Sequence, residues 1–154
     1  MTRLHERVET TLPLDETFDY IADFANARHW DPGVAGARRL DEGPLAVGSR
    51  YELDVRMGGR VAPMAYRISA FERPHRVVLA GTGSGVDAVD DIRFEATPDG
   101  TVVDYTADIR LRGLRRLVQP FLGSAFRRIG REAANGMRRA LAERAAARTA
   151  PVRP

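Results

Sequence analysis

The sequence lacks cysteine and lysine altogether and contains a single tryptophan and three histidines. Without cysteine, the chain can form no disulfide and offers no thiol nucleophile or thiolate metal ligand. The histidines, at positions 5, 29 and 75, show no ligand spacing with one another or with acids, and no HxH or HExxH motif occurs. The sequence therefore predicts neither a metal site nor a cofactor.

Long apolar runs are also missing, so no segment has the length needed to cross a membrane. The first residues, MTRLHERVETTLP, carry charges where a signal peptide needs an apolar segment, which predicts a cytoplasmic protein. With 154 residues, 44% of them hydrophobic and 29% charged, the composition is typical of one soluble domain. We assign this domain to residues 1–147 and expect residues 148–154 to form a frayed tail.

Charge is distributed unevenly along the chain. Residues 111–154 carry eleven Arg and two Glu, whereas the first 110 residues carry thirteen Arg and nineteen acids. All 24 basic residues are Arg, which favours a bacterial source with a GC-rich genome as readily as selection for guanidinium chemistry. The C-terminal part is therefore strongly basic, although the formal net charge is only +3.

Hydrophobic periodicity predicts an α+β fold. Alternation over residues 3–12 predicts a first strand, and helical spacing over residues 14–24 predicts a helix that is followed by a second short helical turn. Six further strands, separated by Gly and Pro turn signals, are predicted over 34–48, 49–60, 61–74, 75–85, 86–100 and 101–113. The glycine-rich GTGSG at 81–85 precedes a strand pattern, so it predicts a hairpin turn and not a phosphate-binding loop.

A long amphipathic helix is predicted at the C-terminal end. Apolar residues recur at steps of three and four from Leu114 to Leu141, and Pro120 either kinks this helix or marks its first turn. Because this is the only element long enough to cover one face of a seven-stranded antiparallel sheet, we expect the sheet to curl around it.

The order of these elements carries a family resemblance. It is accompanied by a Phe-x-x-Ile-x-Asp-Phe pattern at Phe18 to Phe24 and by Trp30, Pro32 and Gly33. The chain resembles the START-like superfamily, also called SRPBCC or birch-pollen-allergen-like, and within it the bacterial polyketide cyclase/dehydrase group, over residues 4–143. The resemblance implies a helix-grip fold, in which a curved seven-stranded sheet wraps the long C-terminal helix and two short helices follow the first strand. It also implies a deep, mostly apolar cavity between sheet and helix.

Strand parity and the helical stripe identify the side chains that should face this cavity. The predicted ligand-binding cavity is lined by Trp30, Tyr51, Leu53, Val55, Met64, Tyr66, Ile68, Ile92, Phe94, Val103, Tyr105, Ala107, Ile109, Phe121, Ala125 and Ile129.

Two residues are candidates for acid or base chemistry. Asp90 shares the parity of Ala88 and Ile92, so it faces the cavity unless it lies in water at the strand end or a bulge exchanges it with Asp91. Inside the cavity it would form a polar anchor with Tyr51, Tyr66 or Tyr105. His29 lies beside Trp30, whose segment the resemblance places at a packed corner, and His29 next to Asp31 is the second candidate.

These observations lead to two functional hypotheses. The first is a protein that binds a hydrophobic small molecule of lipid, polyketide or quinone type. The second is a cyclase, aromatase or dehydratase that closes rings in a carrier-bound poly-ketone chain.

The basic helix leaves its partner open. Its arginines form a solvated face, or Arg127, Arg128 and Arg131 dock an acidic acyl carrier protein or an anionic membrane. No aromatic residues alternate with these arginines, which argues against nucleic acid. The sequence leaves both a monomer and a homodimer open.

Overall fold

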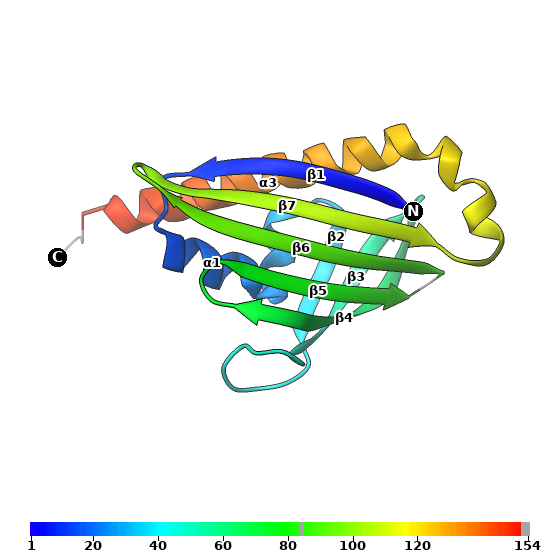
Figure 1. Ribbon diagram of the computed structural model, residues 1–154, viewed down its shortest axis with the longest axis horizontal. Coiled ribbons are helices and arrows are strands. Elements are labelled where there is room, and N and C mark those ends of the chain that lie inside the picture. Colours follow the sequence, from blue (N-terminus) through cyan, green and yellow to red (C-terminus); the bar gives the residue numbers. More distant parts are fainter. Residues whose placement is uncertain (84, 152–154) are drawn as a thin grey trace.

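The strands predicted by alternation form a single curved antiparallel sheet. In the computed structural model, which describes residues 1–83 and 85–151, seven strands pair in the order β1-β7-β6-β5-β4-β3-β2 (Figure 1). The strands are β1 Thr2–Thr10, β2 Val34–Arg39, β3 Arg50–Met57, β4 Arg60–Glu72, β5 Arg76–Gly83, β6 Val86–Thr97 and β7 Gly100–Leu111. Residue 84, in the predicted turn at 81–85, lies outside the described residues.

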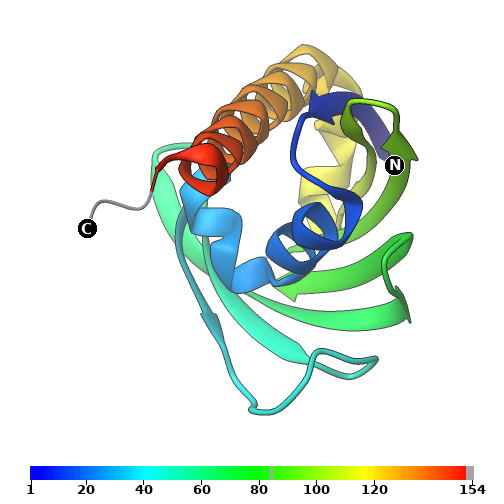
Figure 2. The ribbon, with the colours of Figure 1, turned by 90° about the vertical axis from the view of Figure 1, so that its left-hand side faces the viewer.

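The helices lie on the concave side of the sheet. The short helical elements α1 Leu14–Ala22, η1 Phe24–Asn26 and α2 Ala27–Trp30 follow β1, and the long helix α3 Gly123–Thr149 closes the chain. Figure 2 shows the sheet curving around α3, with α1 and α2 between them at one end. This arrangement is the predicted helix-grip fold.

The C-terminal helix begins later than its apolar periodicity predicted. Residues 113–121 form two 3-10 turns, η2 Gly113–Leu117 and η3 Gln119–Phe121, and the α-helix starts only at Gly123. Pro120 has no N–H group, and Gly113 has a φ of 63°, so the chain turns twice before the helix can propagate. At the other end α3 continues to Thr149, so the first residues of the predicted tail are helical; residues 152–154 lie outside the described residues.

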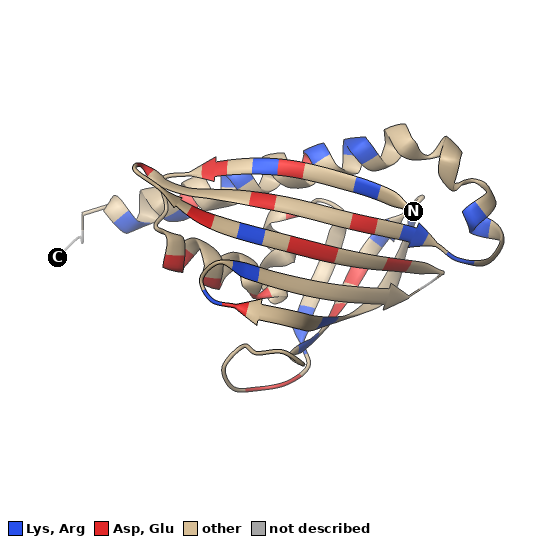
Figure 3. Cartoon of the chain, in the orientation of Figure 1, with Lys and Arg blue, Asp and Glu red and all other residues tan. Residues whose placement is uncertain are grey.

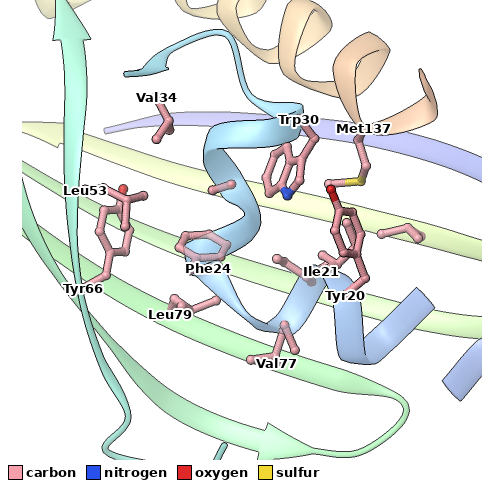
Figure 4. Packing of buried hydrophobic residues seen from close by; sticks show 14 of the residues in the cluster. Tyr20, Ile21, Phe24, Trp30, Val34, Leu53, Tyr66, Val77, Leu79 and Met137 are labelled. Carbon is pink, nitrogen blue, oxygen red and sulfur yellow. The ribbon is translucent and has the colours of Figure 1, made fainter. Parts of the chain in front are cut away.

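A solid core fills one end of the curved sheet. The ring of Phe18 on α1 packs at 5.4 Å from Phe71 and at 5.0 Å from Phe94, in edge-to-face geometry. Figure 4 shows Phe24 of η1 and Trp30 of α2 projecting into the same apolar cluster, which includes Leu79 on β5. The short helices therefore fill the concave face at this end and leave the other end to α3 alone.

Candidate functional site

A cavity of about 810 Å³ lies between the concave face of the sheet and α3. Its walls are mainly aliphatic and come from β1, β3, β4, β6, β7 and the first half of α3. The structure places on these walls Asp90 and nine of the predicted lining residues, namely Trp30, Val55, Met64, Tyr66, Tyr105, Ala107, Ile109, Ala125 and Ile129. Ala125 and Ile129 are also exposed to solvent, so the cavity is open along this part of α3.

Six predicted lining residues face inward but lie in the solid core instead. The prediction is wrong for Tyr51, Leu53, Ile68, Ile92, Phe94 and Val103, all of which are buried in the hydrophobic cluster and do not line the cavity. Parity assigned the correct face of each strand. However, α1, η1 and α2 cover this concave face at these six positions. The cavity begins at the next inward residue of each strand.

Two further candidate residues lie outside the cavity for a different reason. Phe121 is 83% exposed, because it lies in η3 before α3 begins and not on the helical stripe. His29 is exposed at the end of α2, where it contacts Arg28 and lines a small polar depression outside the cavity. The structure therefore brings Asp90 into the cavity but leaves His29 outside it.

The floor of the cavity is polar. Tyr66, Asp90 and Tyr105 are each the first cavity-lining residue beyond the solid core on β4, β6 and β7. Tyr66 lies opposite Gly81 on β5, where a side chain would overlap its ring. The glycine therefore makes room for a tyrosine at this depth.

Asp90 is the central residue of this floor. The β6–β7 register runs without interruption through Asp90, which faces Ala107, and only 6% of the residue is exposed. Its Oδ1 accepts a hydrogen bond of 2.8 Å from the Tyr105 hydroxyl. Burial raises the pKa of Asp90 to about 7, and the charge of Asp31 adds to the effect, although the Tyr105 hydrogen bond opposes it.

The two floor tyrosines remain protonated. Burial, together with the nearby Asp90 charge, raises the pKa of both Tyr66 and Tyr105 well above the ordinary value. Of the three tyrosines considered as partners of Asp90, Tyr105 forms the hydrogen bond. Tyr51 lies in the core among aromatic rings, with Phe24 at 6.4 Å.

The corner that carries Trp30 is held by contacts to its backbone. Gly136 of α3 packs against the Trp30 carbonyl, where any side chain would overlap that oxygen. The next residue, Asp31, accepts a 2.8 Å hydrogen bond from the Gly33 N–H, and Arg56 Nη1 donates to the Pro32 carbonyl at 2.7 Å. The Trp30 ring lies 6.0 Å from that of Tyr105, so this packed corner forms one side of the cavity floor.

Sequence reasoning missed several charged residues that line the cavity. Glu6 lies on β1 between Leu4 and Val8 in the inward phase, so strand parity alone could have identified it. Asp31 lines the cavity beside Trp30, and burial raises its pKa. Arg56, Arg60 and Arg115 also contribute to the wall, but each appears in the sequence as an ordinary surface arginine.

The protonation state of Asp90 decides which hydrogen bonds the cavity floor can offer to a guest. When Asp90 is ionised, it accepts a hydrogen bond from the single O–H of Tyr105. The tyrosine oxygen can then only accept a hydrogen bond from a guest. When Asp90 is protonated, it can donate to Tyr105 or to a guest, and the Tyr105 O–H becomes free to donate. The same two side chains can therefore bind a hydroxyl or a carbonyl, depending on one proton.

Within residues 1–83 and 85–151, no three His, Asp or Glu side chains converge as a metal-binding group. In the same part of the chain, no helix combines the length and the apolar character needed to span a bilayer.

Comparisons with known proteins agree with this architecture. A family model described as polyketide cyclase / dehydrase and lipid transport matches residues 1–142. No curated protein is significantly similar in sequence. Solved structures also match this chain, but their sequence identities are so low that these matches show the fold alone.

Three solved structures illustrate the similarity. The Zhui aromatase/cyclase from Streptomyces sp. R1128 superposes with a TM-score of 0.80 at 15% identity, covering 97% of this chain and 98% of that one. A START superfamily protein from Mycobacterium smegmatis gives 0.77 at 14% identity, covering 92% and 97%. A protein from Thermus thermophilus gives 0.64 at 14% identity, covering 90% and 97%.

Proposed function

The chain belongs to the polyketide cyclase/dehydrase and lipid transport family, and on that basis we propose that it binds a hydrophobic small molecule in the cavity between the sheet and α3. Such a guest would be of lipid, polyketide or quinone type. The observation that carries the proposal is the pairing of an apolar cavity of about 810 Å³ with a polar floor. This volume lies within the range of about 300–1,000 Å³ that is typical of small-molecule sites.

The floor supports a guest that has one polar end. Its apolar part would contact Val55, Met64 and Ile109 on the walls, where it is removed from water. A carbonyl or hydroxyl at the deep end would meet Tyr105 and Asp90. Because protonated Asp90 frees the Tyr105 O–H to donate, a carbonyl guest should bind more tightly below about pH 7.

The only tryptophan of the chain gives a direct assay. Trp30 lines the cavity and is 3% exposed, so a guest that fills the cavity should change its fluorescence. Native mass spectrometry of freshly purified protein would first identify a co-purified molecule, which is then titrated into delipidated protein. A protein that neither retains a small molecule nor responds to long-chain ketones and quinones would contradict the proposal.

A matched pair of variants locates the binding site. Ala107→Phe fills the cavity from β7, whereas Ala65→Phe adds the same ring on the outer face of β4. We expect the first to weaken guest binding at least tenfold and the second to leave it unchanged. Equal binding by both variants would place the guest elsewhere on the protein.

One observation favours a catalytic role for the same cavity. Asp90 has a pKa of about 7 and lies at the cavity floor, so it can take up and return a proton at neutral pH. We propose as the second candidate a cyclase, aromatase or dehydratase that acts on a carrier-bound poly-ketone chain. Support comes from this residue and from the family description.

The floor suggests how ring closure would proceed. The Asp90 carboxylate removes a proton from the CH₂ between two carbonyls, and the resulting enolate carbon attacks another carbonyl of the chain, forming a C–C bond. Protonation of Asp90 releases the Tyr105 O–H, which can then donate to the enolate oxygen. Asp90 returns its proton to the new alkoxide, so the product is a cyclic β-hydroxy ketone and the carboxylate is restored.

Asp90→Asn separates the two candidates. Asparagine keeps an oxygen that can accept from Tyr105 but cannot take the substrate proton. A cyclase would lose turnover of the carrier-bound chain, while the variant stays folded and still binds a guest. Unchanged turnover would remove Asp90 from the mechanism.

A further inference from the structure

The turns between β7 and α3 reverse the usual distribution of polar and apolar side chains. Gln119, a polar residue, is 7% exposed, whereas Leu114 is 84% and Phe121 is 83% exposed. Leu117 and Val118 are exposed as well. We refer to Leu114, Leu117, Val118 and Phe121 as the apolar tip.

Gln119 fixes the apolar tip in place. Its Oε1 accepts from the Leu111 N–H at 3.0 Å, and its Nε2 donates to the Ile109 carbonyl at 2.8 Å and to Thr2 Oγ1 at 3.0 Å. These three bonds hold the turns against the ends of β7 and β1. The exposed apolar side chains are therefore held outward by a buried polar anchor, and such exposure in a soluble protein indicates a contact surface.

The charges around the tip are mostly positive. From Arg110 to Arg131 the chain carries seven arginines and no acidic residue. Acids from outside this stretch pair with two of them, Asp87 with Arg112 and Glu132 with Arg128, so a positive surplus remains. The side chains of Arg116 and Arg127 are exposed, and neither forms a hydrogen bond or an ion pair with another described residue. Figure 3 shows basic residues on the turn and on the adjoining part of α3. A second copy of the same tip would be repelled by this charge, whereas an anionic surface would be attracted.

The tip is continuous with the cavity. Val118 belongs to the tip and also lines the cavity. Leu122, one turn later and outside the tip, lines the cavity too. Gly58, Arg60 and Val61 of the β3–β4 hairpin line the same cavity beyond Met64, on the side away from the polar floor, and Val61 is exposed. The end of the cavity opposite its floor is therefore bordered by exposed apolar side chains and arginines.

We propose that the apolar tip docks on an anionic lipid bilayer, with Leu114, Leu117 and Phe121 entering the headgroup region and the surrounding arginines contacting lipid phosphates. Apolar side chains that protrude from short turns, ringed by basic residues, are suited to shallow insertion in a membrane interface. Docking brings this end of the cavity to the membrane, so a guest with low solubility in water would pass directly between the two. This last step rests on the proposed function, whereas the docking itself does not.

Vesicle flotation tests the docking with paired variants. Wild-type protein should float with vesicles of phosphatidylcholine and phosphatidylglycerol and much less with phosphatidylcholine alone. Leu114→Ser/Phe121→Ser should weaken binding to the anionic vesicles by about tenfold or more. Leu40→Ser/Val47→Ser removes two exposed apolar residues elsewhere and should leave binding unchanged.

A second double variant tests the contribution of the arginines to membrane docking. Arg116→Glu/Arg127→Glu should weaken binding to anionic vesicles strongly at low salt, and the difference from wild type should shrink as salt is added. The proposal is overturned if wild-type protein does not float with anionic vesicles, or if the Leu114/Phe121 double variant floats as well as wild type. Binding to an acidic acyl carrier protein without binding to vesicles also overturns it and identifies a protein partner instead.

Docking and guest binding can fail independently. The Leu114→Ser/Phe121→Ser variant should retain the Trp30 fluorescence response to a guest, because neither residue lines the cavity. Vesicle binding without any guest response in the wild type would refute the proposed function and leave the docking intact. A guest response without vesicle binding would do the reverse.

Discussion

Asp90→Asn should change how the stability of the protein depends on pH. The carboxyl has a pKa of about 7 in the folded protein, raised mainly by burial, against about 3.9 in an unfolded chain. Between these values the folded protein retains a proton that the unfolded chain has released, so stability falls as pH rises from about 4 to about 7. The rise in pKa corresponds to a decrease of about 4 kcal/mol in the free energy of unfolding across this pH interval. Asparagine does not titrate, so the variant should escape this loss.

Urea denaturation of both proteins between about pH 4 and pH 8 measures the effect. The free energy of unfolding of the variant, minus that of the wild type, should grow by up to about 4 kcal/mol as pH rises and level off above about pH 7. Taking this difference removes the contributions of carboxyls that do not interact with Asp90. These include Asp19, whose pKa is lowered by the hydrogen bond from Arg73, and Asp41, whose pKa is lowered by the hydrogen bond from Arg39.

The neighbouring residue provides the control. Asp91 faces the outside of the sheet and accepts hydrogen bonds from Arg76 at 3.0 and 2.9 Å, which lower its pKa. Asp91→Asn should therefore cost about 1 kcal/mol at neutral pH, and this cost should disappear as pH falls through the folded pKa of Asp91. Parallel stability profiles for the wild type and Asp90→Asn would refute the assignment of a buried, proton-retaining carboxyl at the cavity floor.

Three further predictions concern packing. Gly136→Ala should cost about 1–3 kcal/mol of unfolding free energy, because its Cβ would overlap the Trp30 carbonyl; an unchanged urea midpoint would contradict that contact. Gly81→Ala should weaken guest binding measured by Trp30 fluorescence, because the added methyl displaces the Tyr66 ring; wild-type affinity would mean that Tyr66 does not shape the floor. Phe18→Ala should cost about 3–5 kcal/mol in the same denaturation assay, and a smaller loss would show that the core at this end collapses around the gap.

The sequence was sufficient to predict the fold because its signals are local and mutually consistent. Alternation in segments such as Val103 to Leu111 requires a strand with one buried face, and Gly and Pro positions separate the strands. The start of α3 could not be read in the same way. The apolar spacing of Leu114, Leu117 and Phe121 is helical, but Pro120 and the hydrogen bonds of the Gln119 side chain favour tight turns there. Periodicity contains no information about a side chain that bonds to a distant strand.

The candidate site was predictable in part for a related reason. Parity identified Asp90 as an inward carboxyl and included Tyr105 among its candidate partners, since both follow from the period of a strand. It could not show how far along each strand the short helices extend. That distance depends on how Phe18 and Phe24 pack against the sheet, which is a tertiary property. Ile92 and Asp90 have identical parity, yet one lies in the core and the other in the cavity.

Positive charge is neutralised over most of the surface but not around the apolar tip. On the outer face of the sheet, acids neutralise arginines across neighbouring strands, as in Arg3 with Asp108 at 2.7 Å and Arg76 with Asp91 at 2.9 Å. Near the C-terminal end of α3, Arg148 pairs with Glu16 at 2.8 Å, so basic charge is neutralised there too. The stretch from Arg110 to Arg131 contains seven arginines and no acid of its own, and the ion pairs of Arg112 with Asp87 and of Arg128 with Glu132 neutralise only part of this charge. Excess positive charge is therefore concentrated around the apolar tip. An anionic surface would therefore attract this end first, at a rate that falls with added salt, and the adjoining end of the cavity would arrive with it.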